Sequence, residues 1–319
     1  MTTEISLRSV LGDDVLARFL EEDFGKRWRH FQGKAAKVDG LFSWAEMDRL
    51  LAMDVWNAQS IDIVLNGQKA PPQAFCRQGI NRAKQGGLYA DRERVKGLLR
   101  QGASLVLNDI ASLTPGIGAF ADDMKRTFGA KVAANLYYSQ QQVQAFKSHY
   151  DRHEVFAVQL YGQKKWRVYK GQATAPIEHP AFYNVPQANY DRMKGPLDRE
   201  FLMNPGDVIY LPRGQFHDAL AVSGHSLHIT FSCMIPMGLN LVEDMVERLI
   251  GEDMFRADLP RPDTPEGEAA LRQRLEAMTK RISEIYAGDA GIERTRALMK
   301  GFSGVIDSPF NMPSGPHKP

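Results

Sequence analysis

Seven short stretches of the sequence, beginning at Lys131, are rich in β-branched and aromatic residues and follow one another closely. Gly, Pro and polar residues separate them, and most of the intervals are too short for a helix that crosses between parallel strands. The pattern therefore predicts a β-sandwich or barrel rather than parallel βαβ units. The predicted strands are residues 131–138, 145–151, 154–160, 164–170, 206–212, 217–222 and 226–233.

The chain before Lys131 mixes predicted helices with short strands. Ser43 is a suitable N-cap, Asn66-Gly67 a turn, and Gly102 and Gly129 are helix stop signals. The sequence thus predicts three regions: α/β elements over 1–130, a strand-rich core over 131–236 and a helical segment over 237–319. The predicted elements before Lys131 are helices over 11–25, 43–53, 90–102 and 115–129, and strands over 61–68 and 104–109.

Two helices are predicted after Pro236, one over 240–251 and one that opens at Thr264-Pro265, where proline suits the first turn. The second helix carries apolar residues in alternating steps of four and three, which is the stripe typical of helix pairing. The stripe either packs on the strand-rich core or forms the seam of a homodimer. Its members are Leu271, Leu275, Met278, Ile282 and Ile285.

The connection over residues 171–200 contains four prolines and no clear periodicity. Long loops inside compact domains usually have a function. We therefore expect this connection to act on the site, for example as a lid over a barrel mouth.

The composition is that of a globular protein, with 43% hydrophobic residues and a formal net charge of +2 among 319 residues. Such a small charge predicts no direct nucleic-acid binding by the chain as a whole. No stretch approaches the ~20 apolar residues that span a bilayer, and the N-terminus has no apolar leader. Cys76 and Cys233 are too few for a disulfide framework, so a cytoplasmic protein with reduced thiols is expected.

One segment, residues 77–100, is locally basic, with seven Lys or Arg against Asp91 and Glu93. It is either a solvated helix face or a docking surface for an anionic partner.

Several predicted strands have a polar face, because side chains alternate along a strand. In a barrel such a face lines the lumen or meets bulk water. Lys164 shares its face with Trp166 and Val168, which indicates burial. A buried ammonium is costly without an anion, so Lys164 is predicted to clamp an anionic ligand. The other polar sets are Asn135 with Tyr137, His149 with Asp151, and His228 with Thr230 and Ser232.

Two histidines and one carboxylate supply the ligands of a metal site. His149 and Asp151 are two residues apart on one predicted strand, and His217 begins a later one after the turn Pro212-Arg213-Gly214. Two His and one carboxylate on one octahedral face, with open positions opposite, are typical of non-haem Fe(II) oxygenases. An HxD pair alone is a weak signal, but its combination with Lys164 and the late histidine is restrictive.

These residues lie in segments that resemble the JmjC-type oxygenases of the cupin superfamily, in particular the ribosomal oxygenases. NLYYSQQQVQAFKSHYDRHEVFAVQLYGQKKWRVYK resembles the family pattern NLYLTP followed by HYDxHDVFxLQxxGxKxWxxY, and NPGDVIYLPRGQFHDA resembles PGDxLYxPRGxxHxA. The likeness covers most of residues 15–236. It implies a double-stranded β-helix, the cupin or jelly-roll barrel, flanked by N-terminal α/β elements and a C-terminal helical segment.

The resemblance further implies that His149, Asp151 and His217 bind Fe(II) and that Lys164 pairs with the distal carboxylate of 2-oxoglutarate. Tyr137 would hydrogen-bond the same cosubstrate, and Asn135 and Thr230 would line the pocket. The implied activity is a 2-oxoglutarate-dependent dioxygenase that uses O2 to hydroxylate a protein side chain, with ribosomal proteins as candidate substrates.

Two other interpretations remain open. The same chemistry can act on a small molecule or peptide in a biosynthetic pathway. Alternatively, His149, Asp151, His153 and His217 form a closed zinc site or a cupin binding module, in which Lys164 would have no role. Histone demethylation has no separate support, since no methyl-lysine cage is visible in the sequence.

Overall fold

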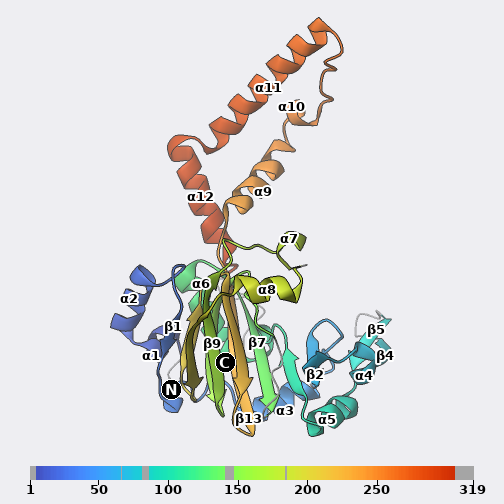
Figure 1. Cartoon of the computed structure of the whole chain (residues 1–319). Coiled ribbons are helices and arrows are strands. Elements are labelled where there is room, and N and C mark those ends of the chain that lie inside the picture. Colours follow the sequence, from blue (N-terminus) through green and yellow to red (C-terminus); the bar gives the residue numbers. More distant parts are fainter. Residues whose placement is uncertain (1–4, 66, 81–85, 141–146, 184, 306–319) are drawn as a thin grey trace, which may run out of the picture. The chain divides into compact units, whose positions relative to one another are not determined.

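The computed structural model describes residues 5–65, 67–80, 86–140, 147–183 and 185–305 (Figure 1). The chain divides into two compact units, one formed by residues 1–128 and 132–234 and the other by 129–131 and 235–319. None of the helices in the described ranges combines the length and the apolar character needed to cross a bilayer.

Two sheets form the barrel of the first unit, and both are built from antiparallel pairs. The larger sheet has the order β1 (Arg29–Phe31), β11 (Val208–Leu211), β8 (Glu154–Tyr161), β13 (His225–Met234), β7 (Lys131–Gln140), β6 (Ser104–Leu107), β2 (Ile61–Leu65) and β3 (Gln68–Lys69). The smaller sheet has the order β10 (Leu197–Met203), β9 (Lys164–Gln172) and β12 (Gln215–Ala221). The hairpin of β4 (Cys76–Ile80) and β5 (Gly86–Ala90) stands apart from both.

Burial explains why β8 and β13 lie in the interior of the larger sheet. Seven of the eight residues of β8 are buried, and so are the eight between the ends of β13. Phe231 of β13 packs against Phe120 of α6 (Pro115–Phe128), with ring centroids 4.9 Å apart. The opposite face of β13, with His228, Thr230 and Ser232, lines a cavity. The strand therefore has one dry face and one face toward the lumen, as its alternation predicts.

Three of the remaining helices of the first unit, α1, α3 and α5, begin at a side-chain cap. The Ser43 side chain accepts the Glu46 N–H, and the Glu46 side chain accepts the Ser43 N–H, which closes a capping box. The α-helices are α1 (Leu7–Leu11), α2 (Asp13–Glu22), α3 (Trp44–Ala52), α4 (Pro72–Phe75), α5 (Arg92–Arg100), α7 (Pro180–Tyr183) and α8 (Gln187–Met193), and the 3-10 helices are η1 (Ala35–Lys37) and η2 (Ala111–Leu113).

The predicted strand over 145–151 is wrong in the part that the structure describes. Residues 147–151 form a single isolated bridge, between His149 and His217, and no continuous strand. The connection over 171–200 is also more ordered than predicted, since it contains α7, α8 and the first residues of β10. The prediction did not include β1, β4, β5 or β10, while the predicted Asn66-Gly67 turn involves a residue outside the described ranges.

The basic segment over 77–100 comprises β4, β5 and α5, with Arg82 and Lys84 outside the described residues. Part of its charge is compensated locally. Lys96 pairs with Glu93 at 3.2 Å, and the Arg77 Nε lies 3.7 Å from the Asp91 Oδ2. Both readings of this segment stay predictions.

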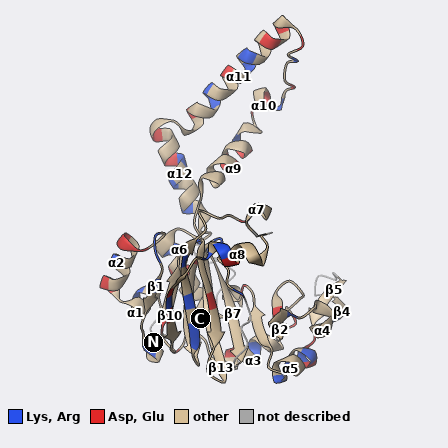
Figure 2. Ribbon diagram, in the orientation of Figure 1, with Lys and Arg blue, Asp and Glu red and all other residues tan. Residues whose placement is uncertain are grey.

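The second unit is helical and consists of α9 (Gly238–Leu249), α10 (Asp253–Arg256), α11 (Pro265–Tyr286) and α12 (Gly288–Phe302). Thr264 caps α11, and Pro265 occupies its first turn, as predicted. Glu residues and Lys or Arg residues are interspersed along α11 (Figure 2). Of its predicted apolar stripe, Ile285 is buried, whereas Leu275 is 49% exposed.

Candidate metal centre

The two segments that carry the proposed metal ligands are joined through their backbones. The His149 N–H donates to the His217 carbonyl at 3.1 Å, and the His217 N–H donates to the His149 carbonyl at 2.9 Å. The Gly214 N–H donates to the Asp151 carbonyl at 2.9 Å. These three bonds align the segment 149–151 with the start of β12, although it is not a strand.

Gly214 is required in the predicted turn before His217. Its φ is +89°, and an added Cβ would lie 2.1 Å from the Ala173 carbonyl oxygen. Only glycine avoids both the strained backbone and this clash. The turn thus lets β12 begin directly beside the segment 149–151.

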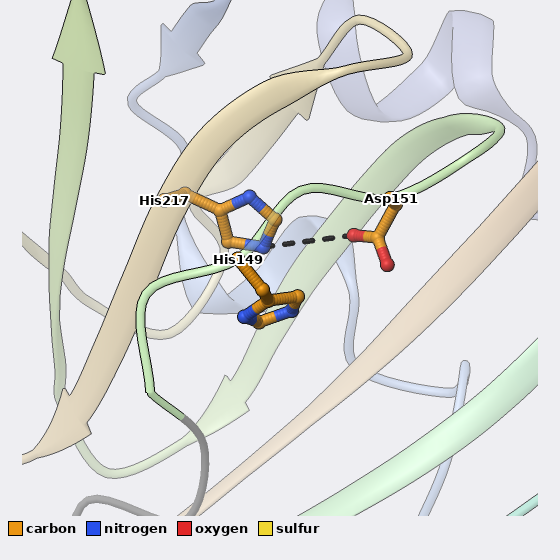
Figure 3. Close-up of side chains that lie close together, drawn as sticks. All are labelled: His149, Asp151 and His217. Carbon is orange, nitrogen blue, oxygen red and sulfur yellow. Dashed lines mark ion pairs between the residues drawn. The ribbon is translucent and has the colours of Figure 1, made fainter. Parts of the chain in front are cut away.

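The side chains of His149, Asp151 and His217 point toward one another (Figure 3). One ligand atom from each lies within 4.8 Å of the other two, and the His217 Nε2 lies 3.6 Å from the Asp151 Oδ2. Two imidazole nitrogens and one carboxylate oxygen fit a first-row divalent metal such as Fe(II). The arrangement brings together the three residues that the sequence singled out.

Both histidines are oriented by carbonyl groups of their own segments. The His149 Nδ1 lies 2.8 Å from the Lys147 carbonyl oxygen, and the His217 Nδ1 lies 3.0 Å from the Gln215 carbonyl oxygen. A carbonyl accepts only, so each Nδ1 is inferred to carry the proton. The lone pair is then on Nε2, which is the nitrogen that a metal requires.

The surroundings of the cluster shift the pKa of Asp151 and that of His217. Burial works against ionisation of Asp151, but His149, His153 and His217 together hold its pKa below the usual value. Burial and the neighbouring His149 lower the pKa of His217 to about 4. Near neutral pH the Asp151 carboxylate is therefore ionised and the His217 imidazole is neutral.

The three side chains line a cavity of about 350 Å³. Its wall also includes every predicted pocket residue: Asn135, Tyr137, Lys164 and Thr230. His153 lines the cavity as well, but it is not part of the group of three potential ligands. A site with three protein ligands leaves positions open, which favours a catalytic over a closed structural metal.

Lys164 is buried as predicted, with 6% of its surface exposed. Its Nζ donates to the Ser139 Oγ at 3.4 Å and to the His228 Nδ1 at 3.3 Å, and none of the carboxylates in the described ranges pairs with it. Burial lowers the pKa of Lys164 to about 7. A dicarboxylate in the cavity would supply the missing negative charge.

His228 is the main site residue that sequence reasoning missed. Its ring stacks on Tyr137, with centroids 4.8 Å apart and planes at 12°, and it accepts a hydrogen bond from Lys164. Burial and the adjacent Lys164 lower the pKa of His228 far below the usual value. The alternation placed His228 on the polar face with Thr230, but the pairing with Lys164 spans two sheets and leaves no local signal.

Two buried polar atoms in the cavity wall have no hydrogen-bond partner within the part of the chain that is described. They are the Ser104 Oγ and the Trp166 Nε1. Buried polar groups are rarely left without a partner. Their position favours a polar ligand in the cavity.

Comparisons with known proteins show which proteins this region resembles. Residues 112–241 match the JmjC domain family. The chain is similar in structure to the ribosomal oxygenase YcfD of Escherichia coli, with a TM-score of 0.56 and 15% identity, over 89% of this chain and 71% of that one. Residues 112–241 are therefore similar to JmjC domains, and the predicted fold, a double-stranded β-helix flanked by N-terminal α/β elements and C-terminal helices, is confirmed.

The curated proteins that the sequence resembles include ribosomal oxygenases. Ribosomal oxygenase 1 of Rattus norvegicus is 29% identical over 70% of this chain and 36% of its own length. The human protein of the same name is 32% identical over 60% of this chain and 28% of its own. The predicted resemblance to ribosomal oxygenases is confirmed, while the chain matches only about a third of the length of these relatives.

Proposed function

We propose that the protein is an Fe(II)- and 2-oxoglutarate-dependent oxygenase that hydroxylates a protein side chain. The observation that carries the proposal is that two imidazoles and a carboxylate converge in a cavity that also holds a buried lysine without a counter-charge. The buried lysine distinguishes this site from a closed zinc centre, because a closed zinc centre has no use for a cationic side chain beside it. YcfD in complex with cobalt and 2-oxoglutarate has the same fold.

In this proposal the residues of the chain divide the work. His149, Asp151 and His217 hold the iron, which when bound supplies the oxidising chemistry with O2. Lys164 binds the distal carboxylate of 2-oxoglutarate, and Tyr137 is placed to donate a hydrogen bond to it. His228 accepts a hydrogen bond from Lys164 and thereby keeps the ammonium in position. Asn135 and Thr230 shape the wall.

A ribosomal protein is the proposed substrate class. The names of the relatives support it, since they include ribosomal oxygenases 1 and 2 and, in Aedes aegypti, a bifunctional lysine-specific demethylase and histidyl-hydroxylase.

The experiment that tests the proposed function has two stages. Purified protein with Fe(II), 2-oxoglutarate and O2 should form succinate, and ribosomal proteins from a deletion strain should lack a mass increment of one oxygen. Absence of succinate would refute the oxygenase, whereas unchanged ribosomal masses would favour a small-molecule substrate.

We further propose a cytoplasmic homodimer that pairs through the second unit. Four apolar side chains of α9 follow one helix face and remain about half exposed: Leu239, Val242, Val246 and Ile250, at 47–53%. Contiguous exposed apolar surface supports a protein interface. Sedimentation of wild type and Val246→Asp tests the dimer: the wild type should be dimeric and the variant monomeric, and a monomeric wild type refutes the dimer.

The cytoplasmic location is supported by the two cysteines, which are both free and buried, in keeping with a reducing compartment.

A further inference from the structure

The residues around the proposed ligands alternate between two surroundings. His149 and Asp151 face the cavity, whereas Ser148, Tyr150 and Arg152 contact the connection that contains α7 and α8. Arg152 pairs with Glu178 at 2.7 Å, and the Tyr150 hydroxyl donates to the Phe182 carbonyl at 3.0 Å. The connection therefore lies behind the ligand segment and not in front of it.

Three residues of this connection share one helix face. Gln187, Tyr190 and Lys194 are spaced by three and four residues along α8 and its C-cap, so their side chains project to the same side. We call them the brace face. All three contact residues that directly adjoin a proposed ligand.

The polar contacts of the brace face converge on Ser148, the residue before His149. The Gln187 Nε2 donates to the Ser148 carbonyl at 3.0 Å, and the Lys194 Nζ donates to the Ser148 Oγ at 3.3 Å. The Ser148 Oγ in turn donates to the Asp218 Oδ2 at 2.7 Å, to which the Tyr169 hydroxyl also donates at 2.7 Å. Since Asp218 follows His217, this network joins the two histidine segments on the side away from the cavity.

The aromatic residue of the brace face, Tyr190, also joins the two histidine segments. The Tyr190 ring meets Tyr150 edge to face, with centroids 5.3 Å apart, and it meets Phe216 at 5.9 Å. Tyr150 lies between His149 and Asp151, and Phe216 precedes His217. Tyr150 and Phe216 also pack on each other, at 5.1 Å.

We propose that Gln187, Tyr190 and Lys194 are positioning residues that set the geometry of the metal site without touching it. The ligand segment needs such support, because residues 147–151 have a single bridge in place of a strand ladder. Groups that orient metal ligands typically change metal affinity by about 10- to 100-fold when they are removed. This inference rests on the proposed metal function.

The test is a titration of the metal-free protein with Co(II), followed by its visible absorption. The double variant Gln187→Ala/Lys194→Met should bind Co(II) about 10-fold more weakly than wild type. Arg192→Ala is the matched control, since Arg192 is exposed on the same helix and its guanidinium pairs with Asn189. This control should bind Co(II) as wild type does, and Lys194→Arg, which keeps a donor, should recover part of the affinity.

Unfolding of the metal-free variants separates positioning from general stability. A Tyr190→Leu variant keeps an apolar side chain and should retain a folded barrel, yet it should also weaken Co(II) binding. If Gln187→Ala/Lys194→Met and Tyr190→Leu both bind Co(II) as tightly as wild type, the inference is overturned and the proposed function is left intact. A wild-type protein that does not bind Co(II) would overturn the metal function and the inference together.

Discussion

The two units of the chain differ in which side chains are buried and which are exposed. The barrel buries polar and ionisable groups, among them Lys164, Asp218 and His228, each no more than 6% exposed. The helical unit buries few side chains and leaves Val246 and Ile250 of α9 about half exposed. Buried polarity is costly unless it is paired or meets a ligand, and exposed apolar surface favours a partner. This contrast is the basis for proposing chemistry in the first unit and association through the second.

The largest expected effect is the loss of the metal. Asp151→Ala should abolish succinate formation and weaken Co(II) binding by more than about 100-fold, because it removes a ligand and not merely a supporting group. Circular dichroism should show an unchanged barrel. Persistent turnover in this variant would remove Asp151 from the site and with it the chemical assignment of the first unit.

A pair of truncations tests the contrast in packing. Ile229→Ala in β13 should lower the free energy of unfolding by about 2–5 kcal/mol, since Ile229 is fully buried. Leu275→Ala in α11, where the side chain is 49% exposed, should cost at most about 0.5 kcal/mol in a single chain. Urea unfolding followed by fluorescence measures both. A large, concentration-dependent cost at Leu275 would mean that a second copy covers the stripe.

The next effect concerns the cation in the cavity. Lys164→Met should raise the apparent KM for 2-oxoglutarate by at least about 30-fold, because one partner of a buried charge pair is lost. The affinity for Co(II) should change much less. Steady-state kinetics at varied 2-oxoglutarate, with the metal saturating, provides the measurement, and an unchanged KM would locate the anion clamp elsewhere.

The pH dependence should be the smallest of these effects. Burial lowers the pKa of Lys164 to about 7 in the ligand-free fold. Below that pH the ammonium is present, whereas above it binding of the dicarboxylate must take up a proton, so the affinity should fall by up to about 10-fold per pH unit. Calorimetric titration of the Co(II) form between pH 6.5 and 8.5 measures this slope, which should vanish in Lys164→Met.

The same shift also affects stability. An unfolded lysine keeps its proton up to about pH 10.4, so the unfolded chain binds more protons than the folded one between roughly pH 7 and 10. The contribution of Lys164 to the free energy of unfolding therefore rises with pH across that window. Lys164→Met should remove this rise, which urea unfolding at a series of pH values can detect.

Local patterns predicted the strands and helices that have clear periodicity or caps, such as β8, β13, α3 and α11. The strand over 145–151 was predicted because His149 and Asp151 alternate with Ser148 and Tyr150. That alternation is present, but a coil held by three backbone bonds to β12 and its preceding turn produces it. β10 was missed because its first six residues are mostly exposed, with no dry face to reveal it.

The cavity was predicted in part. Lys164 gave a local signal because its ammonium shares one strand face with Trp166 and Val168. His228 and the orphaned Ser104 Oγ gave none, since their roles depend on neighbours from other strands. The brace face could not be predicted either, because α8 spans only seven residues. The residue that Gln187 and Lys194 contact, Ser148, is also more than 30 positions away in the sequence.

The shortness of α8 has a consequence for heat inactivation. A helix of seven residues is marginal by itself and frays well before extensive sheets separate. When it frays, the segment that holds His149 and Asp151 loses its backing while the barrel strands remain paired. Warming should therefore abolish the proposed activity several degrees before the secondary structure melts, and cooling should restore it.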